Sequence, residues 1–292
     1  MKQQRQAYLF ALLAILCWST IGSAFKLSLH YLNYLDLLLY SSFTATLVLA
    51  MTLIFQIKAD LLKELKGRDF IRSAFMGLLN PFLYYVVLLK AYELLPAQEA
   101  GTLNYIWPLV LVLISIPMLH QRISKWSFMA VLVSFTGIII ISTHGQLLNM
   151  KFSSPLGVLL ALGSALFWAF YWIFNMKDKR EAVTKLFLNF CFGFLYILVT
   201  VMIMKGPEIP SWQGLAGSVY LGFFEMGIPF ILWLHALKLS STTAKVTNLI
   251  YLSPFLSLVI ISFAVGETIL LSTIVGLIFI VGGIIFQQYL KS

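Results

Sequence analysis

Residues 222–239 read GFFEMGIPFILWLHALKL and begin a longer stretch, Gly222–Gly283, that occurs twice in the chain. The earlier copy, Gly77–Gly137, begins with GLLNPFLYYVVLLKAYEL over residues 77–94. The matching positions, 145 or 146 residues apart, are Gly77 and Gly222, Ala91 and Ala236, Leu94 and Leu239, Pro108 and Pro254, and Gly137 and Gly283. In a chain of 292 residues, this offset indicates one half copied onto another.

The composition indicates a membrane protein. Hydrophobic residues make up 60% of the chain and charged residues 11%, and the mean hydropathy is +0.92, far above that of soluble domains. The net charge of +9 would suggest nucleic acid in a soluble protein, but these basic residues cluster in short loops, which membrane orientation explains better. Cys17 and Cys191 both lie in apolar segments, so we expect no disulfide framework. We predict no nucleic-acid partner.

Ten apolar segments are each long enough to cross a bilayer core of roughly 30 Å at about 1.5 Å per residue. They are Ala7–Phe25, Asp36–Ile57, Phe70–Leu89, Ala97–Leu119, Trp126–Thr143, Pro155–Met176, Val183–Met204, Gly214–Leu237, Thr242–Val265 and Ile269–Leu290. The fold prediction is therefore an all-α membrane protein with ten transmembrane helices.

The basic residues predict how these segments are oriented. With the amino terminus in the cytoplasm, sixteen Lys and Arg residues fall on the cytoplasmic side, whereas Lys26, Lys90, Lys151 and Lys205 fall outside. Cytoplasmic loops of membrane proteins carry such an excess of positive charge. We therefore expect a multi-pass protein of the inner (plasma) membrane with both termini in the cytoplasm.

The number of spans in each copy predicts how the two halves are related in the membrane. Five spans per copy is an odd number, so the second copy must enter the membrane from the opposite face. The halves, which we place at residues 1–146 and 152–292, would then form an inverted-topology repeat with a pseudo-two-fold axis in the membrane plane. Secondary transporters use this architecture, with the substrate site near the midplane between the repeats. The pattern therefore favours a transporter over a structural membrane subunit.

The second copy resembles a known domain. The residues that carry the resemblance are Ala236-Leu-Lys-Leu, Pro254, Gly266-Glu267 and the glycines of the last span, matched in the first half by Ala91, Leu94, Pro108 and Gly137. Together they resemble the EamA domain of the drug/metabolite transporter superfamily. Gln121 stands where Glu267 occurs in the second half, so this position departs from the pattern.

The resemblance implies ten helices in two inverted five-helix repeats around a central cavity. It also implies that spans one, three, four, six, eight and nine line most of this cavity. Members of the superfamily export or import small metabolites, amino acids among them, and some expel cationic drugs.

Glu225 lies in an apolar run, Val219–Leu234, that holds no other charge. An ionisable group at membrane depth usually faces a cavity or a partner. Two interpretations stay open: Glu225 couples transport to a proton or binds a substrate ammonium group, or it makes a structural hydrogen bond to a neighbouring helix. Asn80 matches Glu225 in the first half. It either faces the site or, with Pro81, satisfies backbone groups freed by a helix break.

Aromatic residues near span centres complete the predicted site, because belts at the membrane interfaces explain only those at span ends. Trp18 matches Trp168 across the repeat, and Tyr105 matches Tyr251. Such a lining suits an amphipathic ligand with an apolar or cationic part; helix packing is the alternative. The predicted substrate-binding residues are Trp18, Asn80, Tyr84, Tyr105, Trp107, Trp168, Trp172, Glu225, Asn248 and Tyr251.

Glu99 and Lys245 also match across the repeat. Inverted topology places Glu99 near the outer surface and Lys245 near the cytoplasm, as expected for gates at opposite mouths. With Glu225 they are the predicted gate or coupling residues. The alternative for Glu99 and Lys245 is that they lie at helix ends and reach the interface with their long side chains.

Signals for an enzyme are weak. The aspartates lie at span ends or in loops, and the histidines form no HExxH pair. Ser164 follows Gly163 without the context of a nucleophile elbow. We therefore predict a secondary transporter, not an enzyme, without metal or cofactor, that moves a small metabolite such as an amino acid by alternating access, with export favoured. Efflux of lipophilic cations is the alternative, and an intramembrane lipid-handling enzyme is less favoured.

Overall fold

All regular elements of the described chain are helices. The computed structural model describes residues 2–56, 65–107, 110–111, 113–114, 118, 125–146, 154–204, 206–240 and 248–289. The first half contains α1 (Lys2–Ser28), α2 (Tyr34–Phe55), α3 (Gly67–Gly77), η2 (Leu78–Leu83), α4 (Tyr84–Leu94), α5 (Ala97–Asn104) and α7 (Lys125–Ser142). The second half contains α8 (Pro155–Lys177), α9 (Ala182–Met204), α10 (Trp212–Leu221), η3 (Gly222–Gly227), α11 (Ile228–Leu239), η4 (Asn248–Tyr251), α13 (Leu252–Ala264) and α14 (Leu271–Tyr289).

The helices follow the order of the predicted spans. Six helical stretches of the described chain are long and apolar enough to cross a membrane: Gln3–Ser28, Tyr34–Phe55, Gly67–Leu94, Pro155–Asn175, Ala182–Met204 and Trp212–Ala236. Leu132–Ile141, Leu252–Ala264 and Leu271–Phe286 are shorter apolar helices. The predicted fourth span, Ala97–Leu119, is helical over Ala97–Asn104, and the stretch that follows lies only partly within the described residues.

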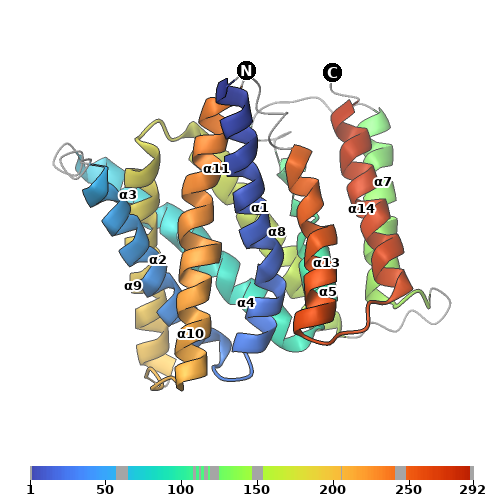
Figure 1. The fold of residues 1–292 in the computed structure, drawn as a ribbon, viewed down its shortest axis with the longest axis horizontal. Helices are drawn as coiled ribbons and strands as arrows, with labels where there is room; N and C mark the ends of the chain where they lie inside the picture. The colour runs from blue at the N-terminus through green and yellow to red at the C-terminus, as the bar shows by residue number, and fades with distance from the viewer. Residues whose placement is uncertain are drawn as a thin grey trace.

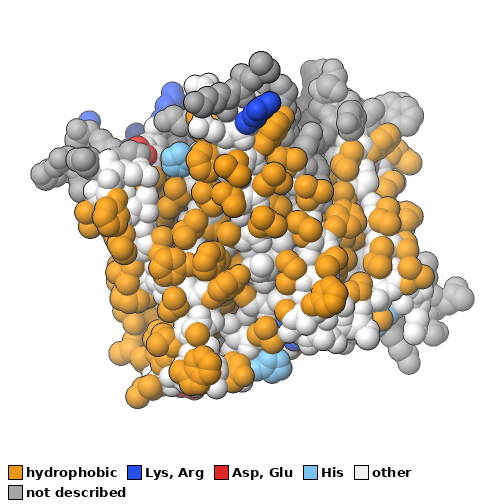
Figure 2. Space-filling model, in the orientation of Figure 1, with side chains coloured by type: hydrophobic (Ala, Val, Ile, Leu, Met, Phe, Trp, Pro, Cys, Tyr) orange, Lys and Arg blue, Asp and Glu red, His pale blue; other side chains and the backbone are white. Residues whose placement is uncertain are grey.

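The surface is that of a membrane protein. Figure 2 shows hydrophobic side chains across the middle of one face, with charged side chains and histidines towards its two margins. Large apolar side chains such as Phe55, Ile203 and Phe263 are more than two-thirds exposed. In water such a surface would cause association, whereas the hydrocarbon core of a bilayer covers it.

Polar residues at the ends of the apolar runs start the helices. Ser154 precedes α8 and accepts a hydrogen bond from the Gly157 N–H at 3.2 Å, and Pro155 occupies the first helical position, where its missing N–H costs nothing. Ser211 caps α10 in the same way through the Gly214 N–H, also at 3.2 Å. These caps satisfy N–H groups that have no partner within the helix.

Contacts between helices come in matched pairs. In Figure 1 the beginning of α1 and the end of α14 lie on the same side, and α7 and α14 run side by side at one edge. These helices of the predicted fifth and tenth spans pack on each other, as do α2 and α9 of the predicted second and seventh. The first span packs on the eighth through α1 and α11, and the third packs on the sixth through α4 and α8. A two-fold relation between the halves requires this pairing.

Two matching glycines allow matching close contacts. A Cβ atom on Gly77 would lie 2.4 Å from the backbone oxygen of Asn189 on α9. A Cβ atom on Gly222 would lie 2.4 Å from the Thr44 Cβ and 2.7 Å from the Ser41 oxygen on α2. Only glycine permits helices to approach so closely, which explains why both copies carry it directly before or within a π-helical turn.

A charged cluster fixes the carboxyl end of α8, which lines the site described below. Arg180 donates to both carboxylate oxygens of Asp178 and, through Nη1, to the backbone oxygen of Asp69 and to Ser73 Oγ at 3.0 and 2.9 Å. Burial alone would raise the pKa of Asp178, but the hydrogen bonds from Arg180 outweigh it and lower the pKa. Lys185 Nζ caps the last turn through the Asp178 oxygen at 3.0 Å.

Candidate functional site

A cavity of about 360 Å³ lies between the two halves of the chain. Its walls come from α1, α4 and α5 of the first half and from α8, η3, α11 and α13 of the second. This volume lies within the range of small-molecule sites. The cavity is therefore the candidate for the substrate site, which the sequence analysis predicts between the two halves.

Seven of the predicted binding residues line the cavity. They are Trp18, Tyr84, Tyr105, Trp107, Trp168, Trp172 and Glu225. Asn80 does not line it. For Asn248 and Tyr251 only the backbone is described, as part of η4, and Lys245 lies outside the described residues.

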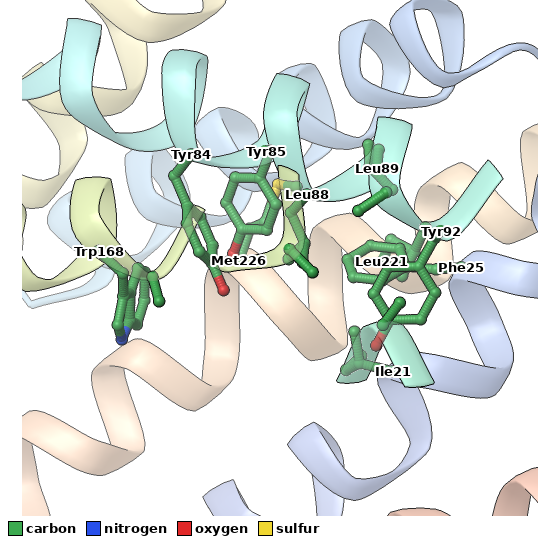
Figure 3. Packing of buried hydrophobic residues seen from close by; sticks show 14 of the residues in the cluster. Ile21, Phe25, Tyr84, Tyr85, Leu88, Leu89, Tyr92, Trp168, Leu221 and Met226 are labelled. Carbon is green, nitrogen blue, oxygen red and sulfur yellow. The ribbon is translucent and has the colours of Figure 1, made fainter. Parts of the chain in front are cut away.

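Trp168 is the centre of the aromatic lining. Its ring lies 4.6 Å from the ring of Tyr84, 5.7 Å from that of Phe230 and 5.7 Å from that of Trp172, measured between centroids. Figure 3 shows Tyr84 and Tyr85 extending from the same helix, with Trp168 beside Tyr84. These distances are those of favourable aromatic pairs. Trp168 therefore packs against neighbouring helices as well as lining the cavity.

Trp18 approaches the cavity from α1, across the repeat from Trp168. Its ring lies 5.5 Å from Trp233 and 6.2 Å from Phe230. Its indole N–H donates to the backbone oxygen of Glu225 at 3.4 Å. A π-helical turn leaves backbone groups without regular partners, and Trp18 satisfies one of them next to the carboxyl.

Glu225 provides the acidic group of the described lining. Its residue is 7% exposed, and its Oε1 accepts a hydrogen bond from the Tyr85 hydroxyl at 2.9 Å. Within the described chain it forms no ion pair with a basic side chain. The carboxyl thus keeps free acceptor capacity towards an aromatic cavity, an arrangement suited to a ligand with an ammonium or other cationic group.

Asn80 occupies the matching place in the other half but has different surroundings. It lies in η2, the counterpart of η3, and is fully buried. The Tyr171 hydroxyl faces the side chains of Asn80 and Asn189. No bond of acceptable geometry joins these groups to each other or to another described residue. The Asn80 side chain is thus sealed away from the cavity.

Sequence reasoning missed several polar and aromatic residues of the site. Asn104 lines the cavity, accepts from the Tyr84 hydroxyl at 3.4 Å and donates to Ser164 Oγ at 2.7 Å. Ser164 in turn donates to the Ala161 oxygen within its own helix, which explains this serine without nucleophilic chemistry. Asn104 directly precedes Tyr105, which was predicted to bind substrate. A polar side chain at this place in an apolar span is the feature that could have identified Asn104 as a site residue.

Two further carboxylates, the predicted gate residue Glu99 and the repeat-motif residue Glu267, lie at one end of α5. Glu99, the predicted gate residue, is fully buried, pairs with His144 after α7 and is not among the residues that line the cavity. Glu267 accepts hydrogen bonds from the Ala97 and Gln98 N–H groups. Its first-half match, Gln121, lies outside the described residues. Across the described residues, no three His, Cys, Asp or Glu side chains gather as metal ligands.

The sequence is similar to those of known transporters. An uncharacterized transporter of Clostridium kluyveri is 23% identical, with 97% of this chain and 93% of that protein covered. Protein PecM of Dickeya dadantii is 25% identical over 73% of this chain and 72% of its own length. The aromatic amino acid exporter YddG of Ancylobacter novellus is 25% identical over 54% of this chain and 55% of its own length.

The fold and the family profile agree with these similarities. A solved crystal structure with 22% sequence identity superposes with a TM-score of 0.68, covering 98% of this chain and 99% of that chain, and so shares its fold. The profile of the EamA-like transporter family matches twice, over residues 5–143 and 155–287. The chain therefore belongs to the EamA-like transporter family and is a multi-pass membrane transporter, not an enzyme.

Proposed function

We propose that this transporter moves a small amphipathic metabolite with a protonated amine, an amino acid or a related compound, and that export is its main direction. The observation that carries the proposal is Glu225, the acidic group in an otherwise aromatic and neutral cavity between the halves. The described lining contains no Lys, Arg or His side chain that would neutralise it. A substrate ammonium group would supply the missing positive charge.

Each part of the cavity has a role in this proposal. Glu225 binds the ammonium group or exchanges a proton as the cavity changes sides, and Tyr85 holds the carboxyl in place. The rings of Trp18 and Trp168 provide stacking and cation–π contacts for the apolar part of the substrate. For an amino acid, the neutral donors at Asn104 and Thr102 are available to the substrate carboxylate. The aromatic amino acid exporter among the relatives supports this class of substrate.

We propose further that residues 1–146 and 152–292 form ten transmembrane helices in two inverted five-helix repeats. The matched helix contacts and the paired π-helical turns support a two-fold relation. One repeat would rock against the other around the cavity, as in other transporters of this architecture. The basic residues favour an inner-membrane location with both termini in the cytoplasm.

Cysteine labelling tests this orientation. On a background without Cys17 and Cys191, a Lys151→Cys variant in intact cells should react with an impermeant maleimide. Labelling only after permeabilisation would place this loop in the cytoplasm and reverse the topology.

Transport in proteoliposomes tests the function. Purified protein should exchange radiolabelled L-phenylalanine across the membrane, and unlabelled aromatic amino acids should compete. An imposed pH gradient should drive accumulation if Glu225 couples to protons, and should change nothing if Glu225 only binds the ammonium group. Failure of every amino acid to compete would reject this substrate class.

A lipophilic cation is the second candidate, and one observation favours it. An amino acid carries a carboxylate, yet the described lining offers no basic side chain to it. A cation such as tetraphenylphosphonium needs only the carboxyl and the aromatic rings. Binding of tetraphenylphosphonium that L-phenylalanine does not displace would support efflux of lipophilic cations.

A further inference from the structure

Hydrogen bonds tie the amino-terminal end of α5 in the first half to the loop between α13 and α14 in the second. The Glu267 carboxylate accepts from the Ala97 N–H at 2.8 Å and from the Gln98 N–H at 3.2 Å. These first-turn N–H groups have no partner within the helix, and a negative charge is stabilised at this end of a helix. Glu267 therefore caps a helix of the other half.

Gln98 makes the connection stronger. Its Nε2 donates to Glu267 Oε2 at 3.3 Å and to the Thr268 oxygen at 3.1 Å. Its Oε1 accepts from the Leu270 N–H at 3.1 Å and from Thr273 Oγ1 at 3.0 Å. Gln98 is 4% exposed, and both ends of its amide are used. We call Ala97, Gln98, Glu267, Thr268, Leu270 and Thr273 the α5 clamp.

The α5 clamp lies at the wall of the cavity. Ala97 and Gln98 both line the cavity, whereas Glu267 is half-buried between exposed Gly266 and Thr268. When the clamp separates, water at this surface can form hydrogen bonds with the groups that the clamp had paired. Opening therefore leaves no buried polar group without a partner. A polar clamp deep in the hydrocarbon core would lack this replacement.

Because the α5 clamp joins the two halves, it can have one of two roles in transport. Alternating access moves one repeat against the other, so a contact between the repeats at one end of the cavity either opens or acts as a fixed hinge. Every cavity residue of α5 lies within seven residues of Ala97, so release of Gln98 moves the wall itself. The wall contact favours opening.

Building on the proposed function, we propose that the α5 clamp is a gate that opens and closes this end of the cavity in each transport cycle. Gln98 and Glu267 are its positioning residues, because their hydrogen bonds hold the amino-terminal end of α5 against the loop before α14. The gate requires that weakening the clamp increases access to the cavity, and that restoring its charge pattern closes it again.

The first experiment measures access without a substrate. Ser257 lines the cavity on α13, and a Ser257→Cys reporter in a background with Cys17→Ala and Cys191→Ala offers a thiol for a charged methanethiosulfonate reagent. In Gln98→Glu, two carboxylates meet and the donor to Glu267 is lost. The labelling rate of the full-length protein should rise roughly 2- to 10-fold, the change expected for the loss of one or two hydrogen bonds.

A charge-exchange variant is the matched control. Gln98→Glu with Glu267→Gln returns one carboxylate and one amide to the pair, with the amide of residue 267 now donating to residue 98. Labelling should fall part of the way back to the parent rate, because the exchanged pair regains the bond between residues 98 and 267 but not the bond to the Thr268 oxygen. If Gln98→Glu does not fold, Glu267→Gln alone serves, because it removes the charge from the cap while keeping the shape.

Thermal unfolding of the same variants separates the gate from a fixed support. A fixed clamp predicts a lower midpoint with an unchanged labelling rate, and that result would overturn the gate. Equal labelling in the parent, the single variants and the exchanged pair would overturn it as well. Because the reporter needs no substrate, these outcomes are independent of whether amino acids prove to be transported.

Discussion

The two π-helical turns, η2 and η3, share a position in the repeat but differ in what they place at the cavity. In η3, Glu225 faces the cavity, accepts from Tyr85 and lies beside the Trp18 indole. In η2, Asn80 turns away from the cavity and faces Tyr171 without a hydrogen bond of acceptable geometry among the described residues. The two halves thus share a backbone distortion, but only one of them places the side chain at its centre in the cavity lining.

The difference shows how a symmetric scaffold holds an asymmetric site. Matched glycines before or within the turns keep matched helix crossings, so the backbone of each half has little freedom to diverge. A side chain within a turn can change without disturbing those crossings. Four sets of substitutions test this division between the cavity side chains and the scaffold.

Glu225→Gln should have the largest effect. It keeps the shape of the side chain and the bond with Tyr85 but removes the negative charge from the cavity. A hydrogen bond to a charged group is worth about 1.5–3 kcal/mol, so binding of an amine substrate should weaken by roughly 10-fold or more. Titration calorimetry with the transported amino acid measures this, and unchanged affinity would make Glu225 as structural as Asn80.

Gly77→Ala and Gly222→Ala should destabilise the protein to similar extents. Each added methyl group meets the opposite helix at 2.4 Å, and overpacking of this kind costs about 1–3 kcal/mol. Gly163→Ala is the control, because a Cβ atom there has no neighbour within 4 Å; it should stabilise α8 by about 0.5–1 kcal/mol. Thermal unfolding in detergent gives all three values. A large difference between the losses of stability in Gly77→Ala and Gly222→Ala would show that the two helix crossings are not equivalent.

Tyr85→Phe and Tyr171→Phe compare the tyrosine next to each turn. Loss of the Tyr85 hydroxyl removes a 2.9 Å bond to Glu225, so substrate affinity should fall by roughly 2- to 10-fold. Loss of the Tyr171 hydroxyl removes a buried group that forms no such bond with any described residue and should leave affinity unchanged. Equal losses in binding assays would show that both turns contribute to the site.

Asn80→Ala should have the smallest effect. Its amide is buried without a hydrogen-bond partner among the described residues, so its removal relieves a desolvation cost that offsets the small space left behind. Stability should change by less than about 1 kcal/mol, and transport should stay within about 2-fold of the parent. A transport defect at normal stability would instead bring Asn80 into the transport mechanism.

Much of the site could be predicted from the sequence because the membrane makes polar and aromatic residues conspicuous. Glu225 stood out through its depth in an apolar run, and Trp18 and Trp168 through their distance from the interfaces. Asn80 was predicted to line the site because of its place in the repeat, but it does not line the cavity. Position in the repeat predicts the equivalence of the backbone, whereas the rotation of a side chain around a π-helical turn depends on tertiary packing. Tyr85, Trp233 and Asn104 were missed for the same reason, since no period in the sequence shows which face meets the cavity.

The pairing of α7 with α14 has a consequence for how the protein is made. α7 packs mainly on α14, and Ser134 of α7 donates to the Ile280 oxygen of α14 at 3.2 Å. Synthesis proceeds from the amino terminus, so α7 enters the membrane long before its main partner, the last described helix, exists. The first half cannot complete its packing alone, and the newly made chain must wait in the bilayer with α7 exposed to lipid. Synthesis of α14, rather than completion of the first half, therefore sets the earliest point at which α7 can reach its packed position.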